Sequence, residues 1–551
     1  MVLKYLFLTL PYFYMHFLSL LILLVFSLLT LGFADLFLLK KKKLGKRKRL
    51  FWCTPFILAG FVLLSLKVYL GLTHTLFNSF PDDIQFLLLG RELADERGVD
   101  VLRAYENVHK PLIMMLFALL LKSAGIGISI ISIRLLSPMM DILSAYFLYL
   151  IGCKLFSRRV GLVGAFLLTL NSVWWYFGHH ILSDVPSIAI ALGAFYFLLK
   201  GMENVGWKGL RYYILAGTCA GISILFTYAQ LPLLFLPLLL VLPFSTSEKN
   251  KKSFFVKSGI YILLSVLIPL IGTGIFILWI HGFKLSEISL MKIIAYNQHV
   301  MHSVIFHRGE WLFYFKELFW SLTILPFFLA GYGIYSVLEE WKKDLRGEKI
   351  LPLIYFLLFF VSLTLRLCIM GEQRYVLSLL PIACLYVAIA VEKIADYDPK
   401  KGVLILVLAL LSGFYMPHKL HPYTPINFKE GDFKVQCDAI RAYYIDKKFA
   451  MEEEVVMNTI LTALININSM PHHIYFTFTN ERIRDIVYIY TGVKPMYAGA
   501  LSELVVENGD ILVWAGKEKG VILPEIKYFQ PIVKTTVGKG KMIVGVYIAK
   551  I

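Results

Sequence analysis

Long, almost uninterrupted apolar segments recur along this chain, and they restrict its fold more than any other feature. Residues 51–72, 129–151 and 254–280 are each long enough to cross a bilayer, which takes ~18 apolar residues. Hydrophobic residues make up 58% of the 551 positions, more than a soluble domain needs. Because backbone polar groups in lipid must be satisfied within the segment, these spans are helices. The chain is therefore predicted to be a polytopic α-helical protein of the cell membrane.

Clusters of Lys and Arg separate the apolar segments and orient them. The most basic cluster is K-K-K-K-L-G-K-R-K-R, Lys40 to Arg49, which is expected to be cytoplasmic. The net charge of +18 lies mostly in such short loops, which indicates membrane orientation and not binding to nucleic acid. Residues 3–39 form either one tilted helix or a hairpin. With them, about twelve spans are predicted: 51–72, 129–151, 160–178, 186–200, 211–226, 229–244, 254–280, 318–338, 351–369, 376–391 and 402–416.

Composition divides the chain into three parts. Residues 1–50 form an N-terminal membrane anchor helix and a basic cytoplasmic loop, and residues 51–416 form the transmembrane domain, with a first extracytoplasmic loop at 73–128. Within that loop, residues 111–125 favour an interfacial helix, since they are apolar but short. From 417 to 551 the chain becomes more polar, with strand patterns at 474–478 and near both 512 and 545 and a helix pattern after Asn480. A small extracytoplasmic α/β domain is predicted there.

An acidic pair opens the first outer loop. Phe80 to Leu93 reads F-P-D-D-I-Q-F-L-L-L-G-R-E-L, so Asp82 and Asp83 follow Pro81 at the start of a predicted helix. One interpretation is structural, because Asp is a good N-cap and negative charge suits a helix N-terminus. The other is catalytic, because an acidic pair at the start of a helix at the membrane edge indicates chemistry at the boundary between water and lipid. The surroundings favour the catalytic interpretation.

The predicted topology places further polar side chains in the same outer layer, and ionisable residues at the membrane face of a bundle tend to be functional. Carboxylates there can accept a proton, and cations can hold a phosphate. Sugar transfer from a lipid phosphate needs this combination: the acceptor hydroxyl loses a proton, the transition state resembles an oxocarbenium ion, and the phosphate leaves without acid help. The residues are Asp82, Asp83, His109, Lys110, His179, His180, Asp184, the His299–His307 cluster, Arg308, Arg374 and Tyr375.

These segments carry a resemblance. P-D-D-I-Q-F-L-L-L-G-R-E-L is similar to the first-loop motif P-D-E-x-x-Y-x-x-x-x-R-E-M of the GT-C membrane glycosyltransferases, in particular the lipid A aminoarabinose transferases and the dolichyl-phosphate-mannose protein mannosyltransferases. V-H-K-P, I-L-S-D-V-P, H-R-G-E-W-L-F-Y and E-Q-R-Y-V-L-S-L-L-P resemble later family segments in the same order, across residues 51–395. Two positions depart: Asp83 replaces a Glu, and Gln85 stands where the aminoarabinose transferases carry Arg.

The resemblance implies a GT-C fold, with residues 51–416 as the catalytic domain, and a role for each matching residue. Asp82 would be the catalytic base, supported by Asp83 and Asp184, and Lys110, Arg374 and Tyr375 would bind the donor phosphate. His109, His179, His180 and His299 would contact substrate or a metal. The resemblance assigns no definite cofactor, and a divalent metal ion stays open. So do the structural alternatives: an N-cap role for Asp184, backbone-satisfied interfacial histidines at 179 and 180, and a snorkelling Arg374.

The predicted function is therefore inverting transfer of a sugar from a polyprenyl (dolichyl or undecaprenyl) phosphate to a hydroxyl on a protein, lipid or glycan, at the extracytoplasmic face. The partners are the lipid-linked sugar, the acceptor and membrane lipids, with no nucleic acid. A transporter or lipid flippase is the alternative, and it predicts charged residues near mid-span, broken helices and repeated halves. A third interpretation is a non-catalytic scaffold, which has no use for Asp82, Lys110 and Asp184 on one face.

Overall fold

The structure is a computed structural model, and it describes two sets of residues. In the first part of the chain these are 58–68, 81–95, 101–106, 110–123, 126–178, 182–239, 248–284, 313–343, 347–364 and 373–414. In the C-terminal part they are 473–476, 481–493, 507–516, 529–537 and 542–549, and a few single positions lie between these ranges.

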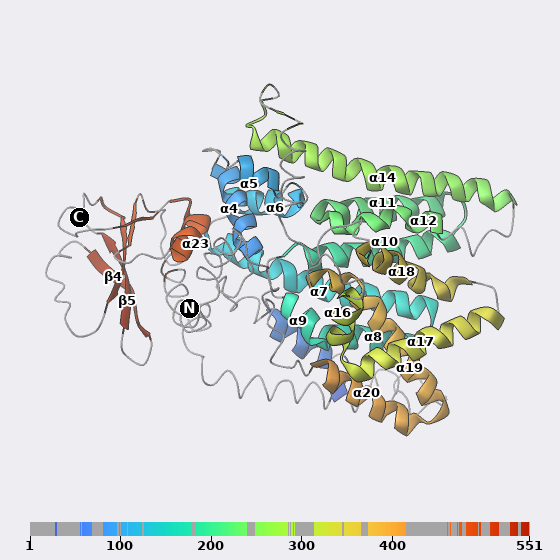
Figure 1. The fold of residues 1–551 in the computed structure, drawn as a ribbon. Helices are drawn as coiled ribbons and strands as arrows, with labels where there is room; N and C mark the ends of the chain where they lie inside the picture. Colours follow the sequence, from blue (N-terminus) through green and yellow to red (C-terminus); the bar gives the residue numbers. More distant parts are fainter. Residues whose placement is uncertain are drawn as a thin grey trace, which may run out of the picture.

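The described part is a helical bundle with a β-sheet at one end (Figure 1). The helices are α4 (Pro81–Asp95), α5 (Val101–Glu106), α6 (Pro111–Ser123), α7 (Ile126–Leu155), α8 (Arg158–Leu170), α9 (Ser172–Phe177), α10 (Asp184–Glu203), α11 (Gly206–Phe226), η2 (Tyr228–Phe235), α12 (Leu236–Leu239), α14 (Glu248–Ile280), α16 (Phe313–Leu322), α17 (Ile324–Lys343), η4 (Gly347–Ile350), α18 (Leu351–Thr364), η5 (Gln373–Ser378), α19 (Leu380–Tyr397) and α20 (Pro399–Phe414). A shorter apolar helix, Leu58–Val68, precedes them.

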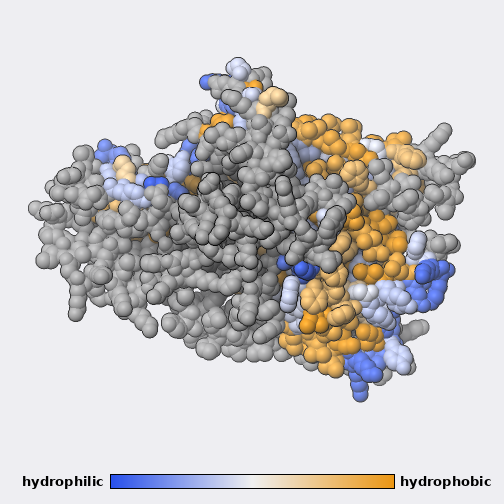
Figure 2. Space-filling model, in the orientation of Figure 1, coloured by the Kyte–Doolittle hydropathy of each residue, from blue (hydrophilic) through white to orange (hydrophobic). Residues whose placement is uncertain are grey.

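Helix α10 lies in the centre of the bundle and α14 at its edge. The apolar window of α10 is 72% buried, whereas that of α14 is 22% buried. Helix α11 lies between them and meets α14 closely, because a Cβ added at Gly217 would lie 2.8 Å from the Tyr261 carbonyl oxygen. In Figure 2, apolar side chains form a broad patch on the described surface of the bundle, as expected of a surface that faces lipid, and hydrophilic side chains gather at its end.

Four described helices are long and apolar enough to cross a membrane, or five if a bent pair counts as one span. They are Ser132–Leu155, Asp184–Glu203, Gly206–Phe226 and Phe254–Ile280. The predicted spans 129–151, 186–200, 211–226 and 254–280 fall on these helices. The total of about twelve spans stays a prediction, since much of the apolar sequence lies outside the described residues.

Three predicted spans are interrupted. The 160–178 span breaks at Asn171, whose side-chain oxygen accepts from the Trp174 amide at 3.0 Å and so starts a new helix, α9. The 229–244 span begins as the 3₁₀ helix η2. The 318–338 span is two helices, α16 and α17, bent by 111° at Thr323, which has a φ of 68°. Hydropathy alone does not detect such breaks, because the apolar composition continues through them.

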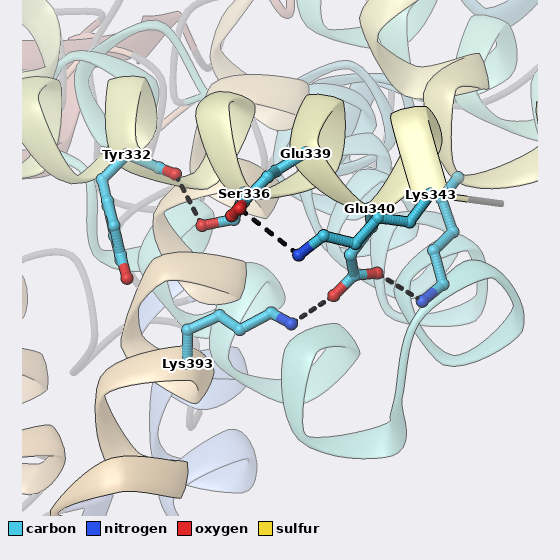
Figure 3. A network of polar contacts seen from close by, with 7 residues as sticks. Tyr332, Ser336, Glu339, Glu340, Lys343 and Lys393 are labelled. Atoms are coloured by element: carbon cyan, nitrogen blue, oxygen red, sulfur yellow. Dashed lines mark hydrogen bonds and ion pairs between the residues drawn. The ribbon is translucent and has the colours of Figure 1, made fainter.

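Ion pairs gather at the end of the bundle opposite the start of α10. Figure 3 shows Glu340 of α17 paired with Lys393 of α19. Lys349 also pairs with Glu340, and its Nζ lies 2.7 Å from Glu340 Oε2. At the same end Lys154 pairs with Glu203. These residues belong to the basic loops that were predicted to share the cytoplasmic side. The structure brings the loops to one end, and the side that this end faces stays a prediction.

The C-terminal part contains a five-stranded sheet in the order β2-β1-β3-β5-β4. The strands are β1 (Ile474–Phe476), β2 (Met496–Tyr497), β3 (Ile511–Gly516), β4 (Phe529–Val537) and β5 (Met542–Ala549), and α23 (Glu481–Thr491) follows β1. Strand β1 is parallel to β2 and β3, whereas β5 is antiparallel to β3 and β4. The strand patterns near 475, 512 and 545 and the helix pattern after Asn480 match these elements, and β4 is an addition.

Candidate active site

Helix α4 carries the acidic pair in its first turn. The helix begins at Pro81, a residue whose fixed φ suits the first helical position. Asp82 and Asp83 are therefore its second and third residues, in the first turn, and the capping alternative for this pair is untested. An electrostatic interaction with the helix dipole remains available to both carboxylates. Their side chains lie outside what the structure describes.

Lys110 packs against the same helix. Its Nζ lies 5.0 Å from the centre of the Phe86 ring, and only 1% of the residue is exposed. Position 86 is one helical turn after position 82, so the structure brings Lys110 to the face of α4 that also carries position 82. Phosphate binding predicts that Lys110 lies in a wet cleft. The structure differs from this prediction, because the residue is buried between α4 and the start of α6.

The packing of α4 against α6 depends on a glycine. A Cβ at Gly90 would lie 2.7 Å from the Phe117 Cβ, which is closer than side chains allow. Because Lys110 immediately precedes α6, this close approach sets the distance between Lys110 and the helix that carries Asp82. The predicted short helix at 111–125 is confirmed as α6.

The far end of α4 contacts the C-terminal part of the chain. Tyr488 of α23 donates a hydrogen bond to Asp95 Oδ2 at 3.3 Å, and Arg91 Nη2 lies 2.7 Å from Asp95 Oδ1. Gly492 has a φ of 73°, and a Cβ there would overlap the Arg91 guanidinium. Burial, followed by the nearby acidic charges, raises the pKa of Tyr488 to about 12, so its hydroxyl stays a donor at neutral pH.

Asp184 is the first residue of α10, and it does not cap that helix. Ser183 occupies the N-cap position, with no side-chain capping bond. Asp184 is 3% exposed, and among the described residues its Oδ2 has no hydrogen-bond partner. The N-cap interpretation of Asp184 is therefore wrong. A buried carboxylate oxygen without a partner is costly, and this arrangement is typical of a position that binds substrate or a cation.

Turn η5 carries Arg374 and Tyr375, and it lies against α9 and α10. Tyr375 is buried, with 3% exposure, whereas the side chain of Arg374 lies outside the described residues. The last residue of η5, Ser378, accepts a hydrogen bond from Gln230 at 3.1 Å. The structure thus brings the predicted 374–375 segment next to the helix that begins with Asp184, although the two lie far apart in sequence.

Sequence reasoning missed a buried ion pair. Lys67 and Asp141 pair inside the bundle, and the two side chains are each 1% exposed. Trp174 Nε1 donates to Asp141 Oδ1 at 2.7 Å, and the Lys67 ammonium lies 4.3 Å from the centre of the Trp175 ring. A signal was present in the sequence, because both residues are ionisable positions within predicted spans.

The ion pair lies beside the turn that leads to the second acidic position. A Cβ at Gly178 would lie 2.8 Å from Asp141 Oδ2. Gly178 immediately precedes His179 and His180 and lies six residues before Asp184. The Lys67–Asp141 pair therefore packs directly against Gly178, the residue that precedes this segment.

The histidine predictions remain untested. His109, His179, His180 and His299, with His307 and Arg308, lie outside the described residues. Within the described part of the chain, no group of three or more His, Cys, Asp or Glu could hold a metal ion. A divalent metal stays a prediction, for which Asp184 supplies one unpartnered carboxylate oxygen.

Comparison with known proteins gives a family match and a shared fold. Residues 109–272 match the family described as dolichyl-phosphate-mannose-protein mannosyltransferase. The chain is similar to ArnT from Cupriavidus metallidurans bound to undecaprenyl phosphate, with 13% identity, 90% of this chain and 98% of that chain covered, and a TM-score of 0.51. ArnT in the apo state gives 11% identity, the same coverage of 90% and 98%, and a TM-score of 0.50. No curated protein sequence matches.

A more distant similarity is to the apo oligosaccharyltransferase of Archaeoglobus fulgidus, with 12% identity, 80% of this chain and 64% of that chain covered, and a TM-score of 0.47. The match of residues 109–272 begins beside Lys110 and includes Asp141, Asp184 and Gln230. The predicted resemblance to GT-C glycosyltransferases is therefore confirmed, by the family match and by the fold shared with ArnT.

Proposed function

We propose that this chain, which has the fold of the GT-C glycosyltransferases, transfers a sugar from a polyprenyl phosphate to an acceptor hydroxyl at the extracytoplasmic membrane face. One observation carries the proposal: Lys110 is held against α4 by Phe86, one turn from Asp82. A cation for the donor phosphate and a carboxylate for the acceptor proton thus belong to one helix and its direct neighbour. The ArnT structure of the same fold holds undecaprenyl phosphate, which supports this class of donor.

The chemistry assigns one task to each group. The Asp82 carboxylate takes the proton of the acceptor hydroxyl as that oxygen bonds to the anomeric carbon. The bond from this carbon to the phosphate oxygen breaks, and the phosphate leaves with the electron pair, with its charge stabilised by Lys110 and Arg374. Attack opposite the leaving group inverts the anomeric configuration. Asp184 orients the acceptor or binds a cation, and no step is assigned to a metal.

Two observations favour the alternative of a transporter: Lys67 and Asp141 lie within apolar helices of the bundle, and three predicted spans are interrupted. The two charges neutralise each other, and Trp174 satisfies a further oxygen of Asp141. A transporter that moved a proton or an ion through this pair would have to separate the two charges during each cycle. Sugar transfer requires only that it stay intact, so the two functions predict different outcomes when both charges are removed.

Replacing Lys110 by Met is expected to raise the donor KM about 10- to 100-fold, because one charge-assisted contact to the phosphate is lost. Met is chosen because it keeps the packing against Phe86. The measurement is transfer by the purified protein at varied concentrations of undecaprenyl- and dolichyl-phosphate sugars. Lys122→Met, at the other end of α6, is the matched control and should keep the wild-type KM. An unchanged KM in the Lys110 variant would exclude phosphate binding by this residue.

The C-terminal part should be labelled from outside the cell. A Cys introduced at Gly520, in a chain whose Cys437 is replaced by Ser, is expected to react with a membrane-impermeant maleimide in intact cells. The alternation of basic loops motivates this prediction. Lys42→Cys in the basic N-terminal loop is the control, and it should react only after the cells are opened. The reverse pattern would invert the topology and place Asp82 on the cytoplasmic side.

A further inference from the structure

A break between two membrane helices carries a buried amide that no predicted role explains. Helix α11 ends at Phe226, and Thr227 follows with an extended backbone. The Thr227 hydroxyl accepts from the Ala229 amide at 3.4 Å, and the 3₁₀ helix η2 begins at Tyr228. Gln230 lies on η2 and is 1% exposed. A long polar side chain here is unexpected, since the surrounding sequence is apolar.

The Gln230 amide reaches two different elements. Its Nε2 donates to Ser378 Oγ at 3.1 Å, at the end of η5, and approaches Ser187 Oγ at 3.4 Å, in the first turn of α10. Ser187 Oγ in turn donates to the Asp184 carbonyl oxygen at 2.7 Å. An amide nitrogen has two N–H donors, which matches the two hydroxyl acceptors. A single side chain therefore joins the turn that carries Arg374 and Tyr375 to the helix that begins with Asp184.

Stability alone does not account for a glutamine at this position. Among the described residues its Oε1 has no hydrogen-bond partner although the residue is buried, and such a group opposes folding. An apolar side chain of the same length would remove this unfavourable contribution. Ser187 and Ser378 would each lose one donor, and Ser187 would keep its own hydrogen bond to the Asp184 carbonyl oxygen. The contacts of Gln230 therefore hold η5 and α10 in position relative to each other.

We propose that Gln230 is a positioning residue for sugar transfer: it holds η5 and the first turn of α10 at a fixed separation. This rests on the proposed function, since Asp184 and the Arg374–Tyr375 segment are the groups that it would align. Its Oε1 and the Asp184 Oδ2 are both buried acceptors without a partner among the described residues, on the two elements that contact one another through Gln230.

The test replaces Gln230 by Met and measures transfer from undecaprenyl- and dolichyl-phosphate sugars. We expect kcat to fall about 10²-fold, the effect typical of a misplacement of about 1 Å in an active site. The KM for the lipid donor should rise less than kcat falls, because Lys110, which also binds the phosphate, lies on other elements than η5. Tyr228→Phe is the matched control: it removes a 2.9 Å hydrogen bond from the same helix, but to Thr273 of α14 and not to η5 or α10. It should keep the wild-type kcat.

A double-mutant cycle separates positioning from general destabilisation. Ser378→Ala alone should lower kcat, and adding it to Gln230→Met should cause little further loss, because both changes break one link. A wild-type kcat for Gln230→Met, or losses that multiply in the double variant, would overturn the proposal. If the wild-type protein transfers no sugar from any of these donors, the proposed function fails, and the role of Gln230 fails with it. A transferring wild type beside an unaffected Met variant removes the role of Gln230 alone.

Discussion

Replacing Asp82 by Asn is expected to lower the rate of sugar transfer by about 10²- to 10⁴-fold, the range that general-base catalysis contributes. Asn has the size of Asp but cannot accept the acceptor's proton. The protein should still fold, because Asn caps a helix start about as well as Asp. The lost interaction with the helix dipole is worth only about 0.3–1 kcal/mol. The measurement is kcat of the purified variant, with folding checked by thermal unfolding.

Asp83→Asn is the comparator, because the two residues share the first turn of α4 and contribute equally to the dipole interaction. If Asp82 is the base, Asp83→Asn loses far less activity. Equal losses would mean that neither carboxylate acts alone, and near-normal transfer by Asp82→Asn would leave it an electrostatic role at the helix start. The configuration of the wild-type product tests the reaction course, since a retained anomeric centre excludes a single displacement.

Much of the site could be predicted from the sequence because its signals are local. A proline followed by two carboxylates and an apolar stripe predicts the start of α4, and S-D-V-P predicts the start of α10. Both helices are present. The role of Asp184 as an N-cap was a reasonable alternative on the same local evidence, but the helix begins one residue earlier than a cap would require. A shift of one residue is beyond the accuracy of such patterns.

The rest of the site depends on contacts that no local pattern contains. Gln230 and Ser378 lie 148 positions apart, and their contact requires the turn at Thr227 and the 3₁₀ helix that follows it. Lys67 and Asp141 lie 74 positions apart, in two windows that each looked like an ordinary apolar span. Their charges could be noticed in the sequence, but their pairing could not, because it follows from how the helix Leu58–Val68 packs against α7.

Removing one partner of the Lys67–Asp141 pair is expected to destabilise the protein by about 3–5 kcal/mol, because the remaining charge is left buried without compensation. Asp141→Asn isolates the charge, since the Asn oxygen can still accept from Trp174 Nε1. The double change Lys67→Met with Asp141→Leu should cost far less, since it leaves no buried charge. The measurement is the free energy of unfolding in detergent. Glu203→Gln is the control: its pair with Lys154 is partly exposed, and its loss should cost about 0–1 kcal/mol.

The double variant also decides between the two functions. A transporter that moved a proton or ion through this pair would lose its activity with both charges removed, whatever its stability. A glycosyltransferase needs the pair only to hold Gly178 and the segment that leads to Asp184, and Met and Leu can supply packing there. The rate of transfer per folded molecule in the double variant should therefore fall by no more than about 10-fold. This is a smaller loss than the one expected for Asp82→Asn. Equal destabilisation by the single and double changes would show that the charges do not compensate each other, and would contradict the role assigned to the pair.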